Sequence, residues 1–309
     1  MDTEKRIPIN KIENAGELHL ANLTEDERSL INNYVLLTGN VVEANQLFDC
    51  FYFTLQNLRT CLTLNSNDII IRTEHCPNYG TDFIAINSLV ISFISSAKTL
   101  TEFLRIISKK WLGDNTTNMF DIYCSEKYDN NYTYRLLINL RNYMQHGYLP
   151  VSLNSDRYCF DVHQILNASH FQVKSKLKAD MENLIAKLDK PGDRIANLAL
   201  TYSLAEFTVE IIDIFKYFLS CFKSVIHNSF SNLVKLIKDK PSILCDYHKD
   251  FNGYIFYSKE NRELQAVDTN EDPNSMMTSI EKKVSNIYSE EKHNFDEMQK
   301  LFVFSNDRI

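Results

Sequence analysis

The sequence predicts a mainly α-helical protein, and three observations support this prediction. Glycine and proline are scarce, at 7 and 6 of 309 residues, whereas barrels and sandwiches use many of both in their turns. Apolar residues make up 44% of the chain, which is enough for a sizeable core. Long stretches repeat apolar side chains at steps of three and four residues, the spacing that forms one face of a helix.

The N-terminal part is expected to contain three helices preceded by an irregular arm over residues 1–24. Thr24 is followed by three acidic residues, the pattern of an N-cap with acid in the first turn, which predicts a short helix over residues 25–37. A second helix is expected over residues 40–64, capped by its first residue. A third is expected over residues 82–111, because its apolar stripe is wide and it ends in two lysines.

A polar stretch follows, and the next helix is expected over residues 130–146. Gly147 is a plausible C′ residue for this helix, and Pro150 prevents its continuation. The alternating pattern of residues 148–165 predicts a β-hairpin. A charged amphipathic helix is expected next, over residues 171–188.

The C-terminal part is dominated by one helix, expected over residues 193–240 because apolar side chains recur along its whole length. A hairpin or edge strand is expected near residue 250. Residues 259–275 are polar, which favours a flexible linker, and a last helix is expected over residues 276–301.

These elements group into four regions of the chain. They are an arm (1–24), a helical domain with a β-hairpin (25–165), a long-helix region (166–258), and a linker with a C-terminal helix (259–309).

Charge and cysteine content narrow the class of protein. The net charge of −7 argues against a protein that coats nucleic acid through its phosphates, so any RNA contact should be local. Seven scattered cysteines without a C-x-x-C pair favour a reducing compartment over disulfides or a zinc site. The polar N-terminus does not resemble a secretory signal, and residues 204–226 carry too many charges for a membrane span. We therefore expect a cytoplasmic protein without a membrane segment.

One short motif carries candidate chemistry: Arg141 is followed by a polar residue, Asn142, and, five positions after the arginine, by His146. This R-x4-H pattern at the end of a helix resembles the signature of HEPN ribonucleases, helical bundles found in bacterial toxin–antitoxin and anti-phage systems. The resemblance covers roughly residues 40–150. It implies a HEPN-like bundle that cleaves RNA without a metal or other cofactor, in bacterial defence or growth arrest.

The residue types suit that chemistry. Cleavage of RNA through its own 2′-hydroxyl needs a group that exchanges a proton near neutral pH, which histidine provides. It also needs a fixed cation for the charge on the phosphorane, and a guanidinium matches phosphate oxygens. His146 and Arg141 would fill these roles, and Asn142 would orient the phosphate or the imidazole.

Helix geometry adds a condition to this hypothesis. Positions five apart on a helix are separated by roughly 140° around its axis, so one continuous helix directs Arg141 and His146 apart. Either His146 lies past the helix end, or a two-fold interface completes the site. Since HEPN nucleases are built in the second way, the resemblance implies a homodimer, with an antitoxin or sensor as a further partner.

Two other residues could support the site. Glu102 could approach the motif from the preceding long helix, as an acidic residue does in this family, although a solvated helix face explains it as well. Tyr148 extends the pattern to R-x4-H-x-Y, and one branch of HEPN toxins is adenylylated at such a tyrosine. The other interpretation of Tyr148 is a packed residue that enters the hairpin.

Several alternatives stay open. Arginine and histidine in a last turn also stabilise the helix dipole and the free carbonyls without any chemistry. Arg157 and His163 form a second, weaker pair in a segment with strand-like alternation. Phosphate-loop, dinucleotide-binding and hydrolase motifs are absent from the sequence. The main alternative function is a non-catalytic helical module that binds a protein or nucleotide, with an apolar stripe at Leu219–Phe230 as its contact surface.

Overall fold

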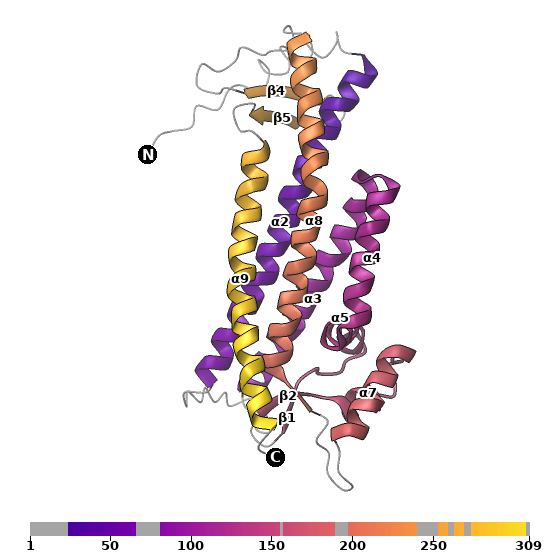
Figure 1. Cartoon of the computed structure of the whole chain (residues 1–309), viewed down its shortest axis with the longest axis vertical. Coiled ribbons are helices and arrows are strands. Elements are labelled where there is room, and N and C mark those ends of the chain that lie inside the picture. Colours follow the sequence, from indigo (N-terminus) through magenta and orange to yellow (C-terminus); the bar gives the residue numbers. More distant parts are fainter. Residues whose placement is uncertain are drawn as a thin grey trace. The chain divides into compact units, whose positions relative to one another are not determined.

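A computed structural model of the chain confirms that the protein is mainly helical (Figure 1). The structure describes residues 24–65, 81–154, 157–188, 197–239, 253–258, 263–268 and 273–306. The arm expected at residues 1–23 lies outside them. The described helices and strands are, in chain order, α2 (Glu25–Asn65), α3 (Thr81–Trp111), α4 (Asp114–Asn130), α5 (Tyr132–Gln145), β1 (Ser152–Asn154), β2 (Arg157–Asp161), α6 (Val162–Leu166), α7 (Ser175–Leu188), β3 (Asn197–Ala199), α8 (Leu200–Asp239), β4 (Gly253–Ser258), β5 (Glu263–Asp268) and α9 (Pro273–Asn306).

The chain divides into two compact units, and α2, α8 and α9 each contribute a segment to both. The first unit comprises residues 1–43 and 219–282, and the second comprises residues 44–218 and 283–309.

The first unit has a small apolar core between the start of α2 and the end of α8. Ile31 and Tyr34 pack with Leu233 and Leu236, all of them buried, and the ring of Tyr34 lies 5.9 Å from that of Phe230. The antiparallel hairpin of β4 and β5 also belongs to this unit.

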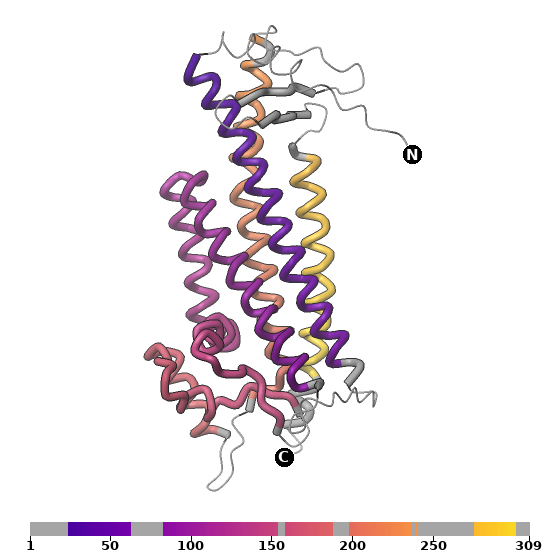
Figure 2. The backbone as a smooth tube through the Cα atoms, turned by 180° about the vertical axis from the view of Figure 1, so that it is seen from behind, coloured from indigo at the N-terminus to yellow at the C-terminus, as the bar shows by residue number. Residues whose placement is uncertain are grey.

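The second unit contains the larger core, and aromatic rings connect its helices. Phe48 of α2 stacks on Phe215 of α8 at 4.7 Å, and Phe93 of α3 lies 5.7 Å from Phe207 of α8. The ring of Phe207 in turn stacks on Tyr134 of α5. These contacts fix α5, which carries the motif, against the long helices; Figure 2 shows the unit from behind.

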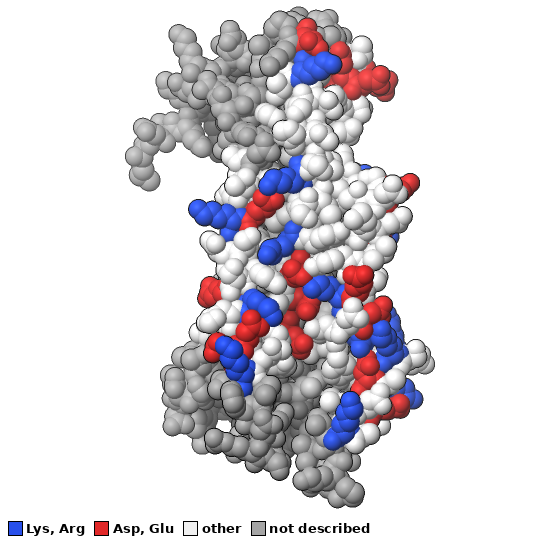
Figure 3. All heavy atoms as spheres, viewed as in Figure 1, with Lys and Arg blue, Asp and Glu red and all other residues white. Residues whose placement is uncertain are grey.

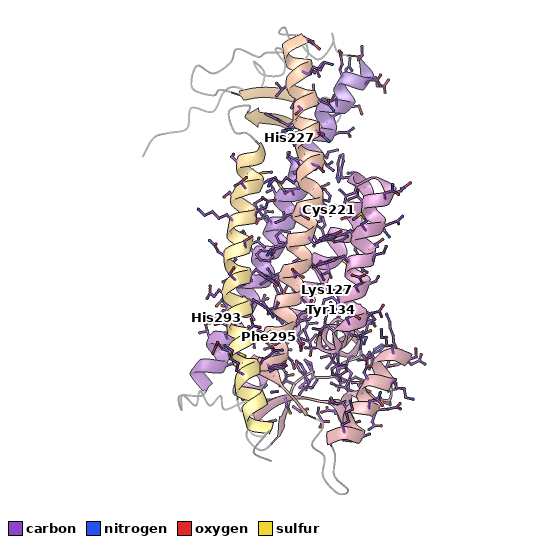
Figure 4. The ribbon with its side chains drawn as sticks, viewed as in Figure 1. Lys127, Tyr134, Cys221, His227, His293 and Phe295 are labelled. Carbon is purple, nitrogen blue, oxygen red and sulfur yellow. The ribbon has the colours of Figure 1, made fainter. Side chains whose placement is uncertain are left out.

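A buried ion pair attaches α9 to α2 within the second unit. The carboxylate of Glu291 is fully buried and accepts two hydrogen bonds from the guanidinium of Arg59, at 2.7 and 2.5 Å. Removal of one partner from such a pair leaves an uncompensated charge, which is strongly destabilising. Further along α9, Phe295, which is labelled in Figure 4, packs with Ala205 and Val209 of α8.

The predicted hairpin after the motif helix is confirmed, and a third strand joins it. β1 and β2 pair antiparallel, with Ser152 opposite Cys159, and β3 pairs antiparallel with β2, with Cys159 opposite Ala199. The sequence did not predict β3, because three residues are too few for a visible alternation.

Among the described helices, α3 alone is long and apolar enough to cross a membrane. By length and composition its segment Phe83–Trp111 could span a bilayer, a test that the core helix of a soluble protein also passes. Its side chains at Val90, Phe93 and Leu100 are fully buried against the rest of the protein.

The start of α2 confirms the predicted N-cap, but the predicted break after residue 37 is wrong. The Thr24 hydroxyl accepts a hydrogen bond from the Glu27 amide, and the Glu27 carboxylate accepts one from the Thr24 amide, which forms a capping box. The helix then continues through Gly39 to Asn65. A mid-helix glycine costs only about 1 kcal/mol, and burial of the flanking apolar side chains Leu37 and Val41 outweighs it.

Helix α4 was missed, because its sequence is polar and rich in asparagine and aspartate, which are weak helix formers. Two buried side chains, Phe120 and Cys124, hold it in place. Three smaller corrections apply elsewhere: α7 begins at Ser175 rather than residue 171, α8 begins at Leu200 rather than residue 193, and part of the segment expected to be a linker forms β5.

Candidate active site at the end of helix α5

Helix α5 places the motif at its C-terminal end. The side chain of Asn131 caps the start of the helix by accepting a hydrogen bond from the Tyr134 amide at 2.7 Å. One face is fully buried, through Leu136, Leu137, Leu140 and Tyr143. Because these residues fix the rotation of the helix, they also fix which motif residues face outward.

The helix ends as the sequence predicts. His146 is the C-cap residue, with φ −85° and ψ 11°, and its amide still donates to the carbonyl of Asn142. Gly147 has φ +85°, a left-handed conformation that glycine adopts at little cost. The chain therefore departs from helical geometry at His146, while the hydrogen bond from its amide to Asn142 keeps this histidine in line with the last turn of α5.

The three motif side chains stand at the surface without partners inside the protein. Arg141 is half-buried, and Asn142 and His146 are exposed. Among the described residues, none of the three side chains makes a hydrogen bond or an ion pair. Asn142 and His146 are four positions apart and share one face, whereas Arg141 is offset from His146 by roughly 140°. The arrangement thus leaves all three free to meet a ligand, with arginine and histidine directed differently.

The residue between them, Tyr143, connects the motif to the following chain. Its ring is buried and stacks on Tyr148 at 4.8 Å and meets Phe171 edge-on at 5.4 Å. The Tyr143 hydroxyl is buried near the Gln164 side chain without a hydrogen bond of good geometry. Burial raises the Tyr143 pKa to about 12.

Tyr148 is a packed residue in this structure. Its hydroxyl lies 3.1 Å from the Ser169 hydroxyl and accepts a hydrogen bond from the His170 amide at 3.3 Å. Together with the stacking on Tyr143, these contacts hold the chain just after the motif.

The structure adds a positioning residue that the sequence did not suggest, Asn87 of α3. Its carboxamide donates to the Val151 carbonyl at 3.2 Å and accepts from the Val151 amide at 2.9 Å. Both residues are almost fully buried. This clamp fixes the route of the chain five residues after His146. The one signal in the sequence is an asparagine inside an apolar helical stripe, a position where an amide needs specific partners.

Glu102 is not brought to the motif within one chain. It is exposed on α3 and pairs with Lys98 at 3.4 Å. It makes no hydrogen bond or ion pair with Arg141, Asn142 or His146, all of which the structure describes.

The weaker pair of Arg157 and His163 does not share one strand. Arg157 opens β2, but His163 lies on the short helix α6, so the expectation of strand for both is wrong. Over the described ranges no group of three or more histidine, cysteine, aspartate or glutamate side chains is arranged to hold a metal.

A second cluster of ionisable residues, between α4 and α8, is satisfied internally. Lys127 lies 2.9 Å from Glu210 and 2.6 Å from Asp213, and the Tyr123 hydroxyl donates to Asp213. Burial acts to lower the Lys127 pKa, but the hydrogen bonds to both carboxylates outweigh it and hold this pKa above the usual lysine value. Figure 4 labels Lys127 next to Tyr134. The cluster is best explained as a link between helices.

Comparisons with known proteins give no relative: no family model, no curated protein and no solved structure matches this chain.

Proposed function

We propose that this protein is a metal-independent endoribonuclease of the HEPN type that acts in bacterial defence or growth arrest. The observation that carries the proposal is the state of the motif: Arg141, Asn142 and His146 stand at a helix end, accessible and without internal partners. His146 is the general acid and base, Arg141 stabilises the charge on the phosphorane, and Asn142 orients the phosphate.

The lack of internal partners favours this proposal over a purely structural role. If Arg141 and His146 served only to satisfy the last carbonyls of α5, their side chains would donate hydrogen bonds to them. Within the described chain neither does. An arginine side chain without a carboxylate partner keeps its capacity to bind a phosphate.

The direct test is cleavage of varied RNAs in EDTA by the wild type, Arg141→Ala and His146→Ala. Each variant should lose most of the activity, since each removes a group needed in the transition state. Lys187→Ala, an exposed cation on α7, is a matched control that should keep activity. A wild type that is inert on all RNAs, or variants as active as the wild type, would overturn the proposal.

The proposal includes a homodimer in which Arg141 and His146 of different protomers share one cleft. Mixing the two inactive variants tests this arrangement. Random exchange gives about half mixed dimers, each with one intact pairing of two, so about a quarter of wild-type activity should return. If both residues act within one protomer, the mixture stays inactive.

The alternative, a non-catalytic binding module, is favoured by a different observation. Met119 and Ile122 on α4 are 58% and 57% exposed, and three positions apart they share a helix face. The stripe suggested by the sequence does not serve this role, because Leu219, Phe222 and Ile226 are buried in the protein's own core. For a binding module, Met119→Ser with Ile122→Ser would abolish activity in cells while Arg141→Ala would not.

A further inference from the structure

We infer that Arg105, Lys109 and Lys110, at the C-terminal end of α3, form a binding surface for the phosphates of single-stranded RNA. The inference extends the proposed function, because it names a second contact with the same substrate at a distance from Arg141 and His146.

The first observation is that these three cations are exposed and unpaired. All three side chains are exposed, and among the residues that the structure describes none of them has a hydrogen bond or ion pair. Some other exposed lysines of this chain have carboxylate partners, such as Lys176 with Asp129 and Lys223 with Glu281, whereas others, such as Lys187, have none among the described residues. The distinguishing feature of the three cations is their spacing: Arg105 and Lys109 are four positions apart and share a helix face, and Lys110 is the next residue, so three cations lie within two helical turns in a protein of net charge −7.

The second observation concerns the neighbouring side chains. The ammonium of Lys110 lies 5.0 Å from the centre of the Trp111 ring, and Trp111 is half-buried. A group of cations beside an aromatic ring suits a nucleic-acid strand, because phosphates bind the cations and the ring offers apolar contact to a base. On the face drawn in Figure 3, acidic and basic side chains are interspersed, which fits a protein that contacts RNA locally rather than over a broad surface.

The helix face favours RNA over an anionic membrane. A helix that lies on a membrane inserts an apolar face into the lipid. In α3 the apolar side chains of this segment, Leu104 and Ile107, are buried inside the protein. The solvent side offers the three cations and one exposed apolar residue, Ile106.

The distance between the cluster and the motif sets the shortest RNA that can contact both. The cluster lies where α3 turns into α4, and α5 begins at the other end of α4 (Figure 2). Helix α4 has 17 residues, which corresponds to roughly 25 Å. The chain just after the motif is held by Asn87, which lies 18 residues before Arg105 on α3, a distance of roughly 27 Å along the helix axis. An RNA of two or three nucleotides is too short to contact both sites. The cluster should therefore affect long substrates and not very short ones.

The test compares two triple variants with the same net charge. One changes Arg105, Lys109 and Lys110 to Gln. The control changes Lys178, Lys292 and Lys300 to Gln, each of which pairs with a carboxylate on its own helix. Binding of a labelled 20-nucleotide single-stranded RNA is measured by fluorescence anisotropy over a range of KCl concentrations, in protein that also carries His146→Ala so that no cleavage occurs.

The cluster variant should lower the slope of log affinity against log salt by about 2, since each lost phosphate contact contributes about 0.7. At 0.1 M salt this slope change corresponds to about a hundredfold weaker binding. The control should keep the wild-type slope. In the cleavage-competent protein, the cluster variant should raise KM for the 20-nucleotide RNA with kcat unchanged, and leave a trinucleotide unaffected.

A gain-of-function variant guards against misfolding as an explanation. Glu102 is the exposed carboxylate of the same stripe, and Glu102→Gln should tighten RNA binding. Equal slopes for the two triple variants, or absence of RNA binding in the wild type, would overturn the inference. The inference would also be overturned if the cluster variant lost binding to phosphatidylserine vesicles but kept its binding to RNA, because the cluster would then be a membrane contact. If the wild type binds RNA through the cluster but cleaves none, the inferred binding surface is upheld and the proposed nuclease activity is refuted.

Discussion

The Asn87 clamp permits a prediction whose magnitude follows from the structure. In Asn87→Ala the amide and carbonyl of Val151 lose their partners, and Val151 is 1% exposed. An unsatisfied buried polar group costs about 1–3 kcal/mol, so two groups cost roughly 2–6 kcal/mol. Local rearrangement that admits water reduces this cost, and we expect a loss of about 2–4 kcal/mol in the free energy of unfolding.

Urea denaturation of the wild type and the variant measures this loss, and hydrogen exchange at the Val151 amide reports on the clamp itself. Ser92→Ala on the same helix is the control: Ser92 is exposed and donates to a carbonyl of its own helix, so its removal should change stability by less than about 0.5 kcal/mol. If Asn87→Ala costs no more than Ser92→Ala and the Val151 amide stays protected, the clamp does not hold this segment.

Three further predictions concern buried groups. Burial raises the pKa of Glu206, so the folded protein binds the proton more tightly than the unfolded chain does. The free energy of unfolding should therefore fall as the pH rises from the unfolded pKa through the raised one. Glu206→Gln should flatten that part of a plot of urea midpoint against pH. Burial raises the Cys159 pKa to about 11, so iodoacetamide at pH 8 should label the exposed Cys50 well before Cys159, as peptide mass spectrometry would detect. Tyr143→Phe removes a buried hydroxyl without a hydrogen bond and should leave thermal stability unchanged or raise it by about 1 kcal/mol, whereas a clear loss would show that the hydroxyl has a partner.

The parts of the fold that could be predicted from sequence are those where local preference and burial agree. Helix α3 matches its predicted range within one residue, because its apolar stripe is continuous and its end carries lysines. Helix α4 could not be predicted, because two buried side chains, Phe120 and Cys124, outweigh an unfavourable composition. The prediction of a break in α2 is wrong for the same reason, because burial of the residues that flank Gly39 outweighs the low helix propensity of glycine.

Some features of the candidate site could likewise be predicted from the sequence, and others could not. The motif, its place at a helix end and the turn at Gly147 follow from local sequence, because helix capping is a local property. The contacts that hold the motif in place, Asn87 with Val151 and Tyr148 with Ser169, join residues far apart in the chain. No pattern in a single sequence shows such pairs, so the support of the site had to come from the structure.

The geometry of α5 narrows how a catalytic site could form. Helix α5 ends at Gln145, and His146 is its C-cap residue, so this histidine lies one position past the last helical residue, although its amide still donates to the Asn142 carbonyl. Within one protomer Asn142 and His146 share a face, and Arg141 starts roughly 140° away from His146. A phosphate held against the Asn142 and His146 face would need its cation from elsewhere. A two-fold interface supplies one, because it brings the partner's copy of Arg141 to the same cleft while the protomer's own Arg141 completes the second site.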